Sequence, residues 1–153
     1  MQRNIAAATF AATALIALAA VPASAGQTRV EVTCAASDAL PPAGPGLVYT
    51  TCAGQQQYRF QSDGIPTSYG IKFTAPPTHC SDVNYQVYAT YEDRLLGRTR
   101  AFLAAGQSEI VPIGNDFARG LQVVNIRALG KVGGCNQGRM HSWAALVELV
   151  VIP

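Results

Sequence analysis

The sequence predicts an all-β protein: a two-layer antiparallel β-sandwich of immunoglobulin-like architecture that follows a signal peptide. Three observations predict this fold. Apolar and polar residues alternate in short runs, Gly, Pro, Asn and Asp separate the runs, and few segments have the apolar spacing of a helix. A chain with eight or nine such strands closes most readily as two packed sheets.

The composition is that of a folded domain. Hydrophobic residues make up 49% of the chain and charged residues 13%, which excludes an intrinsically disordered protein. The net charge of +2 is too small for a nucleic-acid-binding protein that relies on a basic surface. The length of 153 residues fits one domain, which we place at residues 26–153.

Residues 1–25 have the pattern of a secretory signal peptide. Arg3 provides the positive start, an Ala-rich apolar run covers residues 5–21, and Ala23-Ser24-Ala25 has the small-residue cleavage pattern. We therefore expect a secreted or periplasmic protein that begins at Gly26 after cleavage. The alternative is a membrane anchor, but the run lies at the short limit of a bilayer span and Ala promotes insertion weakly. We expect no membrane span in the mature chain.

Four cysteines follow the signal peptide: Cys34, Cys52, Cys80 and Cys135. An even number in an exported chain predicts two disulfides, and the chain has no C-x-x-C motif of the thioredoxin or zinc type. Three pairings are possible. We favour Cys34–Cys52 with Cys80–Cys135, because the first pair is local and the second joins two loops marked by Gly and Pro.

Two elements have a spacing that also fits a helix. In residues 95–105, Gly97 and Thr99 disfavour a helix, and β-branched residues at the end of 141–152 favour a strand. Residues 130–138 contain four glycines and are expected to form a loop. The expected strands are 28–33, 47–51, 56–61, 69–73, 83–91, 95–105, 109–113, 121–129 and 141–152.

The clearest of these strands contains Tyr85. Its odd-numbered residues are apolar, which places Tyr85 and Tyr91 in the core. Its even-numbered residues are polar, which places Asn84, Gln86 and Tyr88 on the outer face. An outward Tyr between amides can stack on a sugar ring or anchor a protein partner. The alternative is a solvent-facing residue chosen for its β propensity.

The second candidate site depends on the Cys80–Cys135 bridge. This bridge would tie its two loops together at one end of the sandwich. The polar residues brought together there would be His79, Asp82, Asn136, Arg139 and His141. Arg139 supplies a forked donor for a carboxylate, a phosphate or a sugar hydroxyl, and Asn136 supplies a donor and an acceptor. The alternative is that these groups satisfy one another and cap the sandwich.

Metal chemistry is not predicted. His79, Cys135, Met140 and His141 are the ligand types of a blue-copper site, but His141 follows Met140 instead of preceding it. A disulfide at Cys135 would also remove the thiolate. No zinc motif is present, so we expect no metal and no cofactor.

Catalytic motifs are also missing. A Ser/His/Asp triad has no G-x-S-x-G elbow to support it. A glycosidase needs two carboxylates across a cleft, whereas most acidic residues lie in predicted turns. The acidic candidates are Asp63, Glu92, Asp93, Glu109 and Asp116.

The sequence therefore predicts an exported, disulfide-linked β-sandwich that is not an enzyme and that binds a ligand or a protein or carbohydrate partner. A structural or adhesive envelope subunit that pairs through strand edges is the main alternative. A small hydrolase is the third. The residues do not identify the ligand.

Overall fold

The structure, a computed structural model, describes residues 26–34, 49–52, 54–137 and 140–153. Within these ranges it contains nine strands, and no described segment is a helix that could cross a membrane. The predicted signal peptide and Arg139 lie outside the described residues. The strands are β1 (Thr28–Thr33), β2 (Tyr49–Thr51), β3 (Gln56–Ser62), β4 (Ser68–Thr74), β5 (Val83–Ala89), β6 (Leu95–Arg98), β7 (Ser108–Gly114), β8 (Gly120–Lys131) and β9 (Ser142–Ile152).

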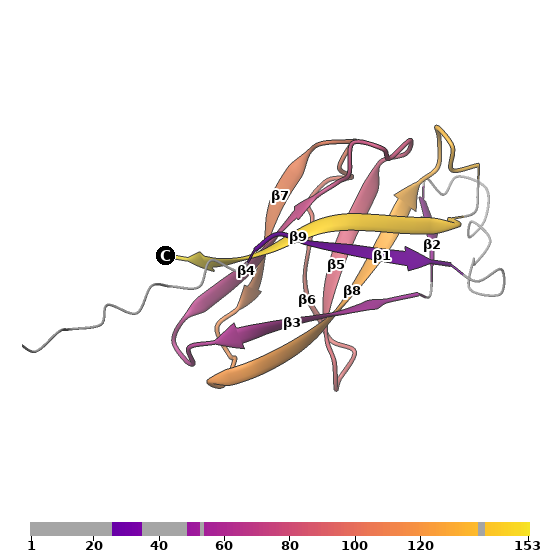
Figure 1. The fold of residues 1–153 in the computed structure, drawn as a ribbon. Helices are drawn as coiled ribbons and strands as arrows, with labels where there is room; N and C mark the ends of the chain where they lie inside the picture. Colours follow the sequence, from indigo (N-terminus) through magenta and orange to yellow (C-terminus); the bar gives the residue numbers. More distant parts are fainter. Residues whose placement is uncertain (1–25, 35–48, 53, 138–139) are drawn as a thin grey trace, which may run out of the picture.

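Two antiparallel sheets pack around one core, which confirms the predicted two-layer β-sandwich. One sheet has the order β1-β9-β4-β7, and the other has the order β2-β8-β5-β6. β3 continues the edge that β2 begins, since β2 pairs with residues 129–131 of β8 and β3 pairs with residues 120–126. Figure 1 shows β9 and β1 crossing in front of β5 and β8.

Large aromatic side chains join the two sheets. Tyr85 of β5 is fully buried, and its ring stacks on Phe73 of β4 with the centroids 5.0 Å apart. The Tyr85 hydroxyl donates to the Ala144 carbonyl oxygen of β9 at 2.6 Å. Trp143 is buried and meets Tyr85 edge-on at 6.3 Å. Because the hydroxyl has a partner, the tyrosine adds apolar area to the core without leaving a buried polar group unsatisfied.

The two sheets also meet along one pair of edges, where β6 approaches β7. A Cβ atom on Gly97 would lie 2.4 Å from the carbonyl oxygen of Pro112, so only glycine fits at this position. Pro112 has no N–H to offer to another strand. The edge of β7 is therefore protected by a proline and by close packing.

The predicted core position of Tyr91 is wrong, because its side chain is 100% exposed. β5 ends at Ala89, whose N–H donates to the Arg94 carbonyl at 2.8 Å and closes a turn. Asp93 in that turn has φ of 49°. Tyr91 therefore lies in the turn, where the strand alternation no longer applies.

The predicted exposure of Asn84 and Gln86 is also wrong: they are 6% and 9% exposed. The Asn84 amide nitrogen donates to the carbonyl oxygens of Thr99 at 2.6 Å and Ala101 at 3.2 Å. These bonds hold the irregular segment that follows the end of β6 at Arg98, before a bridge at Leu103 restores pairing with Val83. The predicted strand over 95–105 is consequently shorter than expected.

The other strand boundaries differ less. β8 extends into the predicted glycine loop, because Gly130 pairs with Val83 and Lys131 pairs with Tyr49. Residues 47 and 48 of the predicted second strand lie outside the described residues. The segment that starts after His141 is a strand, as its β-branched residues predicted, and not a helix.

Candidate functional site

Both predicted disulfides are present. Cys34 pairs with Cys52 and Cys80 pairs with Cys135, each with Cα atoms 5.6 Å apart. The first pair is buried, and the second pair is exposed. Two disulfides are typical of proteins from an oxidising compartment. We call this part of the molecule, where β5 and β9 begin and β8 ends, the disulfide end.

Backbone contacts hold the two loops of the disulfide end tightly together. Gly134 has φ of +57°, and a Cβ atom there would lie 1.9 Å from the Cys80 carbonyl oxygen. The Ser81 hydroxyl donates to the Gly133 carbonyl at 2.6 Å and accepts from the Asn136 N–H at 3.0 Å. These bonds satisfy loop groups within the protein and fix the shape of the end.

A cavity of about 270 Å³ opens beside the exposed disulfide. Its lining includes three of the predicted site residues: His79, Asn136 and His141. Asp82 is not in the lining, and its carboxylate pairs with the Lys131 ammonium at 3.3 Å. The structure thus brings part of the predicted set together and assigns Asp82 to a surface ion pair.

Asn136 has a structural role in this end. Its side-chain nitrogen donates to the Lys131 carbonyl oxygen at 3.0 Å, and its own backbone pairs with Gly133 in both directions at 2.9 Å. This observation fits the alternative in which the polar groups of the two loops satisfy one another. The contribution of Asn136 to the cavity is therefore to shape its wall.

His79 lines the cavity, and one of its ring nitrogens is buried and unpaired in the described structure. Its Nε2 accepts the Ala144 N–H at 3.3 Å, so in the neutral ring the proton lies on Nδ1. Nδ1 is shielded from solvent and has no hydrogen-bond partner in the described structure. Burial, helped by the positive charge of Arg29, lowers the pKa of His79 below its usual 6.5. The imidazole is accordingly neutral near pH 7.

Trp143 also lines the cavity, although no sequence pattern marks it as a site residue. It is the one tryptophan of the chain, and its side chain is 1% exposed. Its Nε1 is buried and, within the described ranges, without a hydrogen-bond partner. A tryptophan at an inward-facing strand position ordinarily belongs to the core. The residues around Trp143 therefore do not indicate that its indole nitrogen is unpaired.

Two charged residues at the cavity were also missed. Arg29 and Glu31 alternate with the buried Val30 and Val32 of β1 and therefore face outward. Antiparallel pairing of β1 with β9 carries them to the cavity, and their side chains form an ion pair at 3.1 Å. Only the strand pairing, which the sequence does not reveal, could have identified them.

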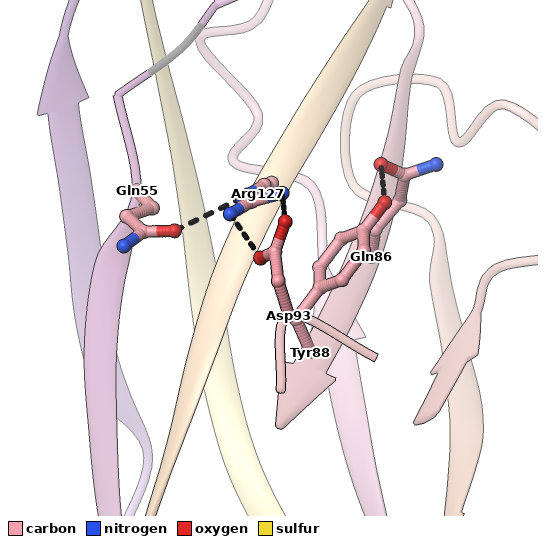
Figure 2. A network of polar contacts seen from close by, with 5 residues as sticks. All are labelled: Gln55, Gln86, Tyr88, Asp93 and Arg127. Carbon is pink, nitrogen blue, oxygen red and sulfur yellow. Dashed lines mark hydrogen bonds and ion pairs between the residues drawn. The ribbon is translucent and has the colours of Figure 1, made fainter. Parts of the chain in front are cut away.

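Tyr88 belongs to a separate site on the outer face of β5, shown in Figure 2. The Arg127 guanidinium lies 4.4 Å from the centre of its half-buried ring, and its hydroxyl donates to Gln86 Oε1 at 3.2 Å. Arg127 also binds both carboxylate oxygens of Asp93 and donates to Gln55 Oε1 at 3.0 Å. One face of the ring is therefore occupied by a protein cation.

The candidate metal and catalytic groups are mostly engaged elsewhere. Cys135 is disulfide-bonded and does not provide a thiolate. Over the residues described, no group of three or more His, Cys, Asp or Glu side chains is placed to hold a metal ion. Glu92 pairs with Arg94 at 3.3 Å, and Glu109 accepts the Arg100 N–H at 2.9 Å. The absence of a metal and of catalysis stays a prediction.

A second hollow lies at the opposite end, which we call the distal end, where β5 ends and β8 begins. It measures about 230 Å³. Apolar groups dominate its lining, among them Tyr91, Leu96, Phe117 and Leu121. Tyr91 and Leu121 are largely exposed at its rim.

Comparison with known proteins gives no family for the chain. No protein-family model and no curated protein matches it. The VP2 subviral particle of infectious bursal disease virus aligns with 93% of the chain at 16% identity and a TM-score of 0.34. Structures of the Gt and Gx strains of that virus align at 17% and 15% identity, with TM-scores of 0.31 and 0.34. The chain covers 36–38% of these proteins, and at such TM-scores the alignments indicate no function.

Proposed function

We propose that the chain is a secreted or periplasmic binding module, without catalytic activity, whose ligand site is the cavity at the disulfide end. The observation that supports this most directly is the cavity of about 270 Å³ itself, which opens beside two loops that a disulfide and hydrogen bonds hold in place. Its lining combines buried apolar residues, such as Met140 and Ala144, with polar residues such as His141. Ligand sites commonly have such a mixed lining.

The framework around the cavity favours the same proposal. The Cys80–Cys135 bridge and the Ser81 hydrogen bonds hold both loops before any ligand arrives. Binding to a preorganised site loses less conformational entropy than binding to mobile loops. Rigid scaffolds commonly carry binding groups on loops of this kind.

A ligand screen followed by NMR tests the proposal. We expect peptides, glycans or small aromatic compounds that bind to shift amide signals around the cavity, together with the single indole signal of Trp143. Ser142→Phe places a ring at the cavity mouth and should abolish these shifts. Ser108→Phe is the matched control, because Ser108 is an exposed strand serine away from the cavity.

Two results would contradict the proposal. One is a screen in which no compound shifts a cavity residue. The other is binding that shifts only residues around Tyr88 and Arg127, which would move the site to the outer sheet face. A turnover product in any binding reaction would replace the non-catalytic proposal with an enzymatic one.

An alternative function, a structural subunit that pairs through a strand edge, has one supporting observation. Within the described residues, β1 covers the edge of β9 only up to Val147, whereas β4 pairs with β9 as far as Ile152. Val151 on this segment is 61% exposed. If edge pairing is the function, sizing at two protein concentrations will show larger species at the higher concentration, and Val151→Lys will remove them.

A further inference from the structure

The two disulfides differ in their exposure to solvent. Cys34 and Cys52 are 8% and 3% exposed and belong to the hydrophobic core. Cys80 and Cys135 are both exposed, and both line the cavity at the disulfide end. A thiolate in solution can therefore approach the Cys80–Cys135 bridge in the folded protein, whereas it reaches the other bridge only after the core opens.

The two loops that the exposed bridge joins are also held by contacts that do not involve its sulfur atoms. The Ser81 hydroxyl donates to the Gly133 carbonyl oxygen at 2.6 Å and accepts the Asn136 N–H at 3.0 Å. Neither Cys80 nor Cys135 belongs to the hydrophobic core that joins the sheets. Cleavage of this bridge therefore removes one covalent tie between the loops and leaves the packed sheets in place.

Ser81 makes the two sulfur atoms of this bridge unequal. Its hydroxyl oxygen lies 3.7 Å from Cys135 Sγ, within the hydrogen-bond range of sulfur. A thiolate at Cys135 would attract the hydroxyl proton away from the Gly133 carbonyl, because hydrogen bonds to charged acceptors are the stronger ones. A sulfur whose thiolate is stabilised leaves more readily. Cys135 is therefore the leaving sulfur, and Cys80 Sγ is the sulfur that is attacked.

We propose that the Cys80–Cys135 bridge is a site of thiol–disulfide exchange whose substrate is an external dithiol. One thiolate of the dithiol attacks Cys80 Sγ, the bridge breaks, and Cys135 leaves as a thiolate. The second thiolate then attacks the mixed disulfide, which frees Cys80 and closes the reagent into its own disulfide. The dithiol thus supplies the two electrons and, through solvent, the two protons that the cysteines gain. This inference does not require that the cavity holds a ligand.

Limited reduction with dithiothreitol under native conditions tests the site. Freed thiols are alkylated with iodoacetamide and assigned by peptide mass spectrometry. We expect Cys80 and Cys135 to be labelled at least about tenfold faster than the buried pair, because their bridge is reached without opening of the core. The Cys34–Cys52 bridge of the same molecule is the internal control. Equal labelling rates, or faster labelling of the buried pair, would overturn the proposal.

The NMR spectrum of the partly reduced protein shows whether exchange is local. We expect amide signals to change at the disulfide end, while the signals of the strands around Phe73 and Tyr85 keep their positions. A collapse of the dispersed spectrum once Cys80 and Cys135 are reduced would mean that reduction unfolds the domain, and it would also overturn the proposal.

A monothiol identifies the attacked sulfur. Glutathione should form its mixed disulfide mainly at Cys80, with Cys135 recovered in alkylated form after a quench with iodoacetamide. Ser81→Ala should remove this preference, and Ser81→Thr, which keeps the hydroxyl, should retain it. Loosening of the loops alone would not change which sulfur is attacked. A glutathione adduct mainly at Cys135, or an unchanged preference in Ser81→Ala, would contradict the assigned direction of attack.

Discussion

The two ends of the sandwich are held together by different means. At the disulfide end, covalent bridges and backbone hydrogen bonds fix the loops, and a cavity lined partly by polar groups remains between them. At the distal end, Phe117 packs edge-on against Phe60 with ring centres 5.2 Å apart and contacts Tyr69 at 6.1 Å. The Tyr69 hydroxyl accepts the Asp63 N–H at 2.6 Å, which ties a second loop to the same cluster.

This difference shows two ways in which a small sandwich fixes its end loops beside a hollow. At the distal end, the hollow of about 230 Å³ lies beside the aromatic cluster, and Phe117 belongs to both. At the disulfide end, the Cys80–Cys135 bridge and the Ser81 hydrogen bonds fix the loops, and the cavity lining includes more polar residues. The bridge at one end thus takes the place of the aromatic contacts at the other.

Removal of the Cys80–Cys135 bridge should have the largest effect. With Ala at both positions, loop entropy over a sequence separation of 55 predicts a loss of about 4 kcal/mol in the free energy of unfolding. The Cys34–Cys52 pair, with a separation of 18, should cost about 3 kcal/mol. Urea denaturation measures both. A loss below 1 kcal/mol for the first pair would show that packing alone holds the disulfide end.

Gly134→Ala should cost about 3 kcal/mol, because the new Cβ would meet the Cys80 carbonyl oxygen and Ala is strained at positive φ. Gly106→Ala is the matched control: its φ of +79° is also positive, but nothing lies within 4 Å of its Cβ position. Thermal unfolding compares the two. Equal melting temperatures would mean that the close approach at Gly134 does not constrain the end.

At the distal end, Phe117→Ala should cost about 2 kcal/mol, below the range for a fully buried phenylalanine because Phe117 is only half-buried. It should leave ligand shifts at the disulfide end unchanged. A spectrum of the variant with a ligand from the screen checks this independence. Loss of binding would show that the two ends are coupled.

The smallest expected effect is a pH dependence at the disulfide end. Since burial lowers the pKa of His79 in the folded state, the unfolded chain binds more protons just below pH 6.5. The contribution of neutral His79 to the free energy of unfolding is therefore complete above pH 6.5. It is lost as the pH falls through the lowered pKa. His79→Ala should remove this component of the urea midpoint, and His141→Ala should retain it. If His79→Ala has the same pH profile as the unmodified protein, this pH dependence does not come from His79.

The sequence correctly predicted features that depend on local patterns of residues. Val30 and Val32 are buried as their spacing indicates, and the loops marked by Gly and Pro are joined by the predicted disulfides. The alternation of apolar and polar residues predicted the wrong burial at two kinds of position. One is where the chain turns, as at Tyr91, and the other is where another segment covers a strand, as at Asn84.

The candidate site was only partly predictable. His79 and His141 were found because the disulfide fixes their loops. The position of Arg29 at the cavity depends on which strand pairs with β1. The unpaired state of the Trp143 indole nitrogen depends on the lack of an acceptor among its described neighbours. Neither property is encoded in a local pattern of residues, because both arise from contacts between distant segments.

A crystal structure of the protein with a ligand from the screen tests the central claim most directly. We predict density for the ligand in the cavity at the disulfide end, beside His79, Met140 and Ala144. Density only in the distal hollow beside Phe117 would contradict the account.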